Sequence, residues 1–158
     1  MVSTIVVFGS LKAINILRFR PDQASHRVEI VELRTVDDVF EAITRMMVRG
    51  APLIGIVGAY GLAMALEEDD TDNNLGNAYG KLLGARPTAV NLRWALDQIH
   101  SRVKPLPLGQ RYDAAKVACG ILAEEDIATN SEIGRHGADL LEKLGKKRAM
   151  SRCLQLNG

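Results

Sequence analysis

The longest apolar run in the chain is VRGAPLIGIVGAYGLAMAL, residues 48–66, which carries no charge after Arg49. Pro52 suits the first turn of a helix, where the backbone N–H has no intrahelical partner. The fifteen residues from Pro52 to Leu66 are fewer than the roughly 20 that span a bilayer, and four consecutive acids, EEDD, follow them. The pattern therefore predicts a buried core helix, whose small residues let neighbouring backbones approach: Gly55, Gly58, Ala59, Gly61, Ala63 and Ala65.

The residues before this helix predict a small sheet and a short helix. β-branched residues on both sides of Phe8-Gly9-Ser10 predict two short strands, and RVEIVELRT at 27–35 predicts a third strand that lies at an edge or carries a bulge. Thr35 and Asp38 have the spacing of a capping box. The helix that follows should have an apolar face made of Val39, Ala42, Ile43, Met46 and Met47.

The residues after the apolar run predict further helices. We expect a polar loop at 67–77 and then a short helix that ends near Gly84. Arg86 precedes a proline and should be extended, and Thr88 can cap the helix TAVNLRWALDQIHSRV. From Arg111 to about Leu144 the apolar spacing predicts one long helix or two. The sequence thus indicates an α+β fold, a mainly helical domain with a small antiparallel sheet.

Charge and cysteine content argue against several classes of function. Lys and Arg total 20 against 19 Asp and Glu, so no basic patch favours nucleic acid, and the pattern favours no membrane span. The two cysteines, Cys119 and Cys153, are far apart and outside any metal-ligand spacing. This pattern is typical of a reducing cytoplasm and predicts neither a disulfide framework nor a metal site. The apolar N-terminal run also lacks a basic region and a cleavage site, so it is not a signal peptide.

Two arginines stand at the starts of predicted helices. Arg49 precedes Gly-Ala-Pro and Arg86 precedes Pro-Thr. Helix N-termini attract anions, and a guanidinium can hold phosphate with two parallel hydrogen bonds. The two residues could form a phosphate clamp if the helix starts converge. Alternatively, each could pair with acids such as EEDD at 67–70.

The cysteines differ in their surroundings. Cys119 lies on an apolar helical face and is most simply a core residue. Cys153 follows Lys146, Lys147 and Arg148, and nearby positive charge favours a thiolate. Cys153 could therefore be either a reactive, functional cysteine or an unreactive one.

Three ordered motifs within residues 30–145 resemble methylthioribose-1-phosphate isomerase. They are TRMMVRGAPLIGIVGAYGLAMAL, ARPTAVNLRWAL and EEDIATNSEIGRHGADLL. The first and third occur more loosely in the wider family, which includes ribose-1,5-bisphosphate isomerases and the alpha, beta and delta subunits of eukaryotic translation initiation factor two B. The middle motif is more typical of the methylthioribose enzyme.

The resemblance implies an aldose-to-ketose isomerisation of 5-methylthioribose 1-phosphate in methionine salvage, in the cytoplasm, without a metal or dissociable cofactor. The substrate is a phosphorylated pentose, and the family is homodimeric. Substrate contacts carry over onto Arg49, Gly50, Ala51 and Arg86, and the family's catalytic cysteine falls in register with Cys153.

The end of the chain departs from the family pattern. AMSRCLQLNG stands where the family has a strand like ILTHCNAG, and the Rossmann-like C-terminal half with the catalytic aspartate does not follow. We therefore expect an isomerase-family domain at 1–145, a divergent tail at 146–158, and a truncated chain with little or no turnover. The alternatives are a non-catalytic regulatory or interaction module, like the translation-factor subunits, and a product without function.

Overall fold

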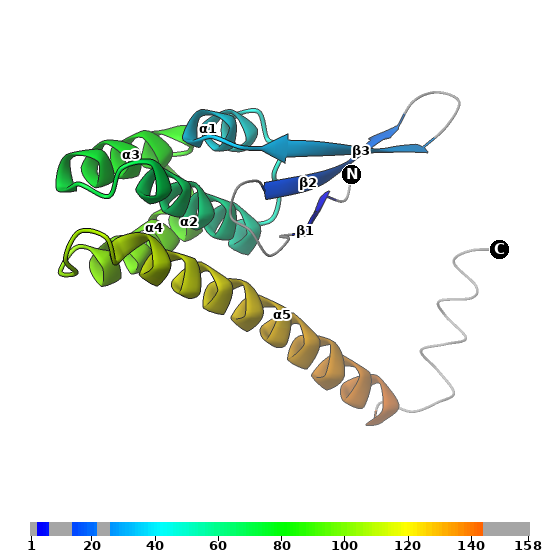
Figure 1. The fold of residues 1–158 in the computed structure, drawn as a ribbon. Coiled ribbons are helices and arrows are strands. Elements are labelled where there is room, and N and C mark those ends of the chain that lie inside the picture. The colour runs from blue at the N-terminus through cyan, green and yellow to red at the C-terminus, as the bar shows by residue number, and fades with distance from the viewer. Residues whose placement is uncertain (1–2, 7–13, 22–25, 144–158) are drawn as a thin grey trace. The chain divides into compact units, whose positions relative to one another are not determined.

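A computed structural model describes residues 3–6, 14–21 and 26–143. The chain divides into two compact units, residues 1–122 and 123–158. Cys153 and the predicted tail at 146–158 lie outside the described residues. The predicted α+β class, mainly helical with a small antiparallel sheet, is confirmed in the first unit (Figure 1).

The sheet has three antiparallel strands in the order β1-β2-β3. Their bounds are Ser3–Val6 for β1, Ile14–Pro21 for β2 and His26–Leu33 for β3. The predicted edge position of the third strand is confirmed, because β3 pairs only with β2 in the described sheet. Ile14 and Leu33 face each other in the register, and both are buried. This pair places the end of β3 against the helical core, where the chain enters the first helix.

Helix α1 spans Val36–Thr44, and its predicted capping box is confirmed. The side chain of Thr35 accepts a hydrogen bond from the backbone N–H of Asp38 at 3.1 Å. Asp38 accepts in return from the N–H groups of Arg34 and Thr35, both at 3.0 Å. The predicted apolar face is correct for its buried residues Val39, Ala42 and Ile43 but wrong for Met46 and Met47, which lie beyond the helix end.

We expect Asp38→Ala to lower the free energy of unfolding at pH 7 by about 1 kcal/mol, because the cap loses its carboxylate acceptor. The hydrogen bond from the Arg34 backbone is the main cause that lowers the pKa of Asp38 in the folded chain. The stabilisation is therefore complete above the pKa of an unfolded aspartate, about 3.9, and is lost as the pH falls through the lower folded value.

Urea denaturation of wild type and Asp38→Ala at a series of pH values measures this difference. Glu41→Ala, a substitution of another acid of α1 that lies outside the cap, is the control. A difference between wild type and Asp38→Ala that stays constant in strongly acidic solution contradicts the assigned role of the carboxylate.

Helix α2, Ala51–Glu68, is the core helix that the apolar run predicts, and residues 54–66 are all buried. In the described part of the chain it is the one helix long and apolar enough to cross a membrane, yet 72% of it is buried within the protein. Helices α1, α3 (Asp72–Ala85) and α4 (Val90–Val103) all contact it. Added Cβ atoms would meet α4 at Gly55 and Gly58, and both α1 and α3 at Gly61.

The boundaries around α3 and α4 correct two predictions. The predicted loop at 67–77 is wrong, because α2 continues to Glu68 and α3 begins at Asp72. Thr71 caps α3 by accepting from the N–H of Asn74 at 3.3 Å, a local bond that lets the helix begin early. Thr88 does not cap α4. The N–H of Ala89 bonds to Arg86 O at 2.9 Å, so Thr88 lies inside a turn and Ala89 is the N-cap.

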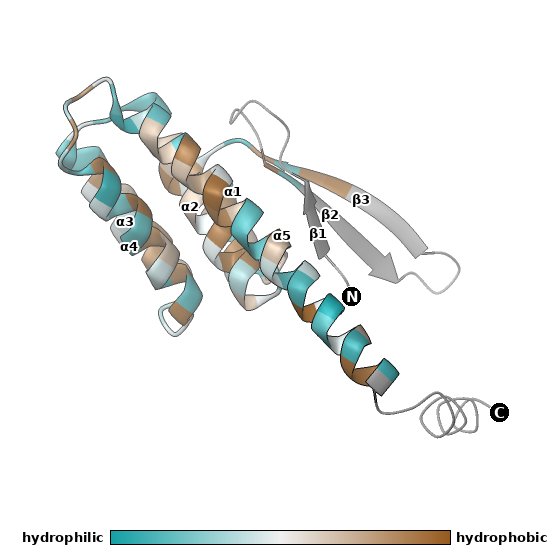
Figure 2. Ribbon diagram, turned by 90° about the horizontal axis from the view of Figure 1, so that it is seen from below, coloured by the Kyte–Doolittle hydropathy of each residue, from teal (hydrophilic) through white to brown (hydrophobic). Residues whose placement is uncertain are grey.

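The predicted segment from Arg111 forms one helix, α5, Arg111–Lys143. In the first unit it buries Arg111, Ala115, Ala118 and Cys119. In the described part of the second unit, residues 123–143, hydrophilic residues predominate and hydrophobic ones stand between them (Figure 2). The large apolar side chains exposed there are Ile127, Ile133, Leu140 and Leu141.

Candidate anion-binding site

The starts of α2 and α4 converge. A Cβ added to Gly55, in the second turn of α2, would lie 2.6 Å from the carbonyl oxygen of Asn91 in the first turn of α4. The same end of the bundle receives the end of α1, because Thr44 Oγ1 donates to Ala85 O at 3.5 Å. The first turns of α2 and α4 thus approach each other, which the phosphate-clamp hypothesis also requires of the loops that precede them.

These two helix starts are also uncapped. Thr35 and Thr71 cap α1 and α3 with their side chains. By contrast, α2 begins at Gly50 and α4 at Ala89, and neither start has a side-chain cap hydrogen bond within the described chain. First-turn N–H groups without an internal partner are available to an anion, and the helix dipole favours negative charge there.

The two arginines have no internal partner in the part of the chain that the structure describes. No hydrogen bond or ion pair involves the guanidinium of Arg49 or Arg86 there, and Arg49 is exposed. The alternative pairing with EEDD is wrong for the two aspartates, since Asp69 bonds to Thr71 and Asp70 accepts from the N–H of Gly109. Both cations therefore remain available to a ligand.

Gly50 has a conformational reason to be glycine. Its φ is +99°, in the left-handed region that side chains avoid. This conformation turns the chain directly from Arg49 into α2, with Pro52 in the first turn as the sequence predicts. Ala51, the first residue of α2, is exposed at the same end. The predicted residues Arg49, Gly50 and Ala51 thus form one continuous helix entry.

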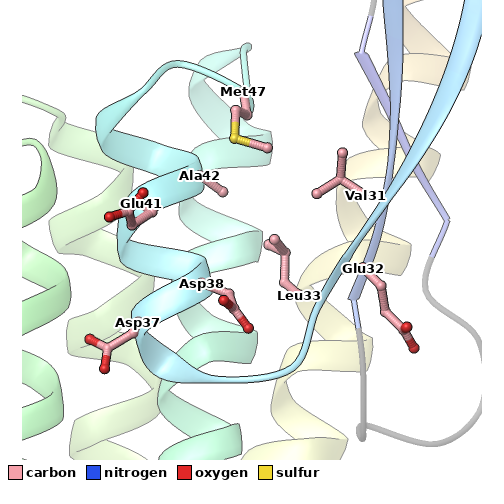
Figure 3. Close-up of a pocket in the computed structure, with 8 residues that line it drawn as sticks. All are labelled: Val31, Glu32, Leu33, Asp37, Asp38, Glu41, Ala42 and Met47. Atoms are coloured by element: carbon pink, nitrogen blue, oxygen red, sulfur yellow. The ribbon is translucent and has the colours of Figure 1, made fainter.

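A hollow of about 290 Å³ lies nearby, between β3, α1 and Met47 (Figure 3). Its lining includes four acids, and charge repulsion argues against a phosphate there. Three of them already pair with cations: Glu32 with Arg34 at 2.7 Å, Glu41 with Arg45 at 2.8 Å, and Asp37 with Lys81. The fourth, Asp38, belongs to the capping box. The hollow is therefore acidic and does not belong to the anion-binding site that Arg49 and Arg86 would form.

Of the two cysteines, the structure describes only Cys119. Cys119 is fully buried, as expected of a core residue, and burial raises the pKa of its thiol to about 12. Within the residues that the structure describes, no three or more His, Cys, Asp or Glu side chains gather as metal ligands. Cys153, the predicted catalytic residue, remains a prediction because it lies outside these residues.

Comparison with known proteins identifies relatives. The family model described as the initiation factor 2 subunit family matches residues 47–148. A methylthioribose-1-phosphate isomerase of Brucella anthropi is 44% identical over 123 residues, which are 78% of this chain and 34% of the relative. That of Escherichia coli is 40% identical over 147 residues, 92% of this chain and 38% of the relative. The chain spans about a third of the length of these curated relatives.

Two solved structures share the fold. The 5-methylthioribose 1-phosphate isomerase of Pyrococcus horikoshii is similar with a TM-score of 0.72 and 30% identity, over 88% of this chain and 40% of that one. The delta subunit of translation initiation factor eIF-2B from A. fulgidus is similar with a TM-score of 0.64 and 32% identity, over 72% of this chain and 36% of that one. An isomerase and a translation-factor subunit thus both resemble these residues.

Proposed function

Because the chain belongs to the initiation factor 2 subunit family, we propose that it supplies the sugar-phosphate-binding part of a cytoplasmic methylthioribose-1-phosphate isomerase. Arg49, Gly50, Ala51 and Arg86 bind the phosphate of 5-methylthioribose 1-phosphate. The reaction is the aldose-to-ketose isomerisation in methionine salvage. Cys153 is proposed as the catalytic cysteine. The named function of the curated relatives supports this substrate.

The observation that carries the proposal is the pair of uncapped helix starts with an unpaired arginine beside each, within the described chain. Two guanidinium groups and first-turn N–H groups match the oxygens and charge of a phosphate monoester. Holding the phosphate at this end fixes the position of the anomeric carbon to which it is attached. Such positioning is a large part of what an isomerase must provide before proton transfer begins.

The test is the affinity of the 158-residue chain for 5-methylthioribose 1-phosphate by isothermal titration calorimetry. We expect Arg49→Gln and Arg86→Gln each to weaken binding by about 10- to 100-fold, the range for losing a charge-assisted hydrogen bond. Increasing salt should weaken wild-type binding more than that of either variant, because each variant has lost one cation.

Matched controls come from neighbouring cations. Arg45 is four residues before Arg49 but pairs with Glu41 at 2.8 Å, and Arg102 lies in the last turn of α4, far along the helix from Arg86. Arg45→Gln and Arg102→Gln should bind like wild type. Equal weakening by all four substitutions, or no binding by the wild type, rules out the proposed clamp.

A second candidate is a non-catalytic regulatory or interaction module. It is favoured by the similarity to the eIF-2B delta subunit from A. fulgidus. This candidate predicts a stable protein partner and no affinity for 5-methylthioribose 1-phosphate. The same calorimetric titration therefore separates it from the first proposal.

A further inference from the structure

Met46 has an unusual backbone conformation. Its φ is +54°, and it is the one residue other than glycine with a positive φ in the part of the chain described. It lies just after Arg45, the C-cap of α1. The N–H of Met46 bonds to Ile43 O at 3.2 Å and the N–H of Met47 bonds to Ala42 O at 2.9 Å. These are the two bonds of a Schellman motif, whose left-handed position normally belongs to glycine.

The backbone strain at Met46 is not offset by burial of its side chain. Met46 is 49% exposed, although its side chain is large and apolar. Val48, two residues later, is fully buried, and Met47 borders the hollow of Figure 3. The chain thus holds an apolar side chain in solvent at a position where glycine would be less strained. Strain of this kind concentrates at functional sites, where the side chain has a use.

Met46 is also close to the proposed clamp. Arg49 follows it by three positions, so their Cα atoms are at most about 11 Å apart. The hydrogen bond from Thr44 to Ala85 holds the same helix end beside the residue before Arg86. An apolar group and Arg49 therefore belong to one short connection between α1 and α2, and the end of α1 contacts the residue before Arg86. This combination suits a ligand with a phosphate at one end and an apolar substituent at the other.

We propose that Met46 is a specificity-determining residue that contacts the apolar 5-substituent of the sugar phosphate. The inference rests on the proposed function and goes beyond it, since the clamp itself recognises only the phosphate. The thioether of methionine is flexible and polarisable, so it packs well against a methylthio group. A hydroxyl at the same carbon would lose water without gaining a hydrogen bond.

The test compares two ligands, 5-methylthioribose 1-phosphate and ribose 1-phosphate, which carries a hydroxyl in place of the methylthio group. We expect the wild-type chain to prefer the first ligand, and Met46→Gly to reduce that preference by about tenfold, the lower end for a small apolar contact. Affinity for ribose 1-phosphate should not change. Met46→Leu should keep most of the preference.

Glycine suits a φ of +54°, so the Met46→Gly chain should unfold at or above the wild-type temperature. This control separates a lost contact from a lost fold. An unchanged preference in Met46→Gly overturns this inference alone. Failure of the wild type to bind either ligand overturns the proposed function, and this inference with it.

Discussion

Replacing Arg111 with alanine is expected to lower the free energy of unfolding by about 3 kcal/mol, because three partly buried carbonyl groups would lose a charged hydrogen-bond donor. The guanidinium of Arg111 is buried and donates to Leu106 O at 2.9 Å, Lys104 O at 3.1 Å and Asp70 O at 2.8 Å. It also pairs with Asp72 at 2.8 Å. One side chain therefore joins the α2–α3 turn to the α4–α5 connection.

Urea denaturation of the purified chain measures the loss. Arg111→Lys should recover only part of the stability, since an ammonium cannot reproduce the planar fork that reaches these oxygens. Lys116→Ala, which removes an exposed cation from the same helix, should change stability by less than about 0.5 kcal/mol. An Arg111→Ala chain as stable as Lys116→Ala would show that the hydrogen bonds of Arg111 contribute nothing net to stability.

Gly55→Ala is the second large effect that we expect, a destabilisation of about 1–3 kcal/mol from overpacking. The new Cβ would lie 2.6 Å from the backbone oxygen of Asn91 and 3.2 Å from the Cβ of Ala95. A backbone atom cannot rotate away as a side chain can, so α2 and α4 must separate. Because this contact also brings the two uncapped helix starts together, affinity for 5-methylthioribose 1-phosphate should fall as well.

The matched control is Gly80→Ala, in the middle of α3. A Cβ at Gly80 would meet nothing within 4 Å among the described residues. Alanine should therefore stabilise the chain there by about 0.5–1 kcal/mol through its helix propensity. The same substitution should thus lower the stability of the chain at Gly55 and raise it at Gly80, a difference that thermal unfolding can measure. A stabilising Gly55→Ala would contradict the close approach of α2 and α4.

Local signals predicted the parts of the fold that local contacts determine. The capping box of Thr35 and Asp38 and the first-turn Pro52 involve residues close in sequence, and both are confirmed. The core helix followed from its uninterrupted apolar composition. Thr88 failed as a cap because a turn closed by Arg86 and Ala89 moved the helix start by one residue. Propensity alone could not distinguish between these two local arrangements.

Contacts between residues far apart in the sequence determine the rest of the fold and of the candidate site. The sequence named Arg49 and Arg86 as candidates, but contacts between residues far apart in the sequence, such as Gly55 with Asn91, bring their helices together. The acids at 67–70 looked equally suited to those arginines, yet Asp70 binds residues 39 or more positions later. Nothing in the spacing indicated that Met46 would take a left-handed conformation, because that follows from where α1 ends.

The position of α2 in the chain has a consequence for synthesis in the cell. Its thirteen consecutive buried residues, 54–66, leave the ribosome before α3 and α4, which cover two of its sides. Roughly 40 more residues must be translated before α4 is complete, which takes a few seconds at ordinary rates. During that time the nascent chain presents a strongly apolar segment, which is a binding site for chaperones of the kind that hold unfolded chains. Translation speed between codons 67 and 103 should therefore influence how much of this protein reaches its native state.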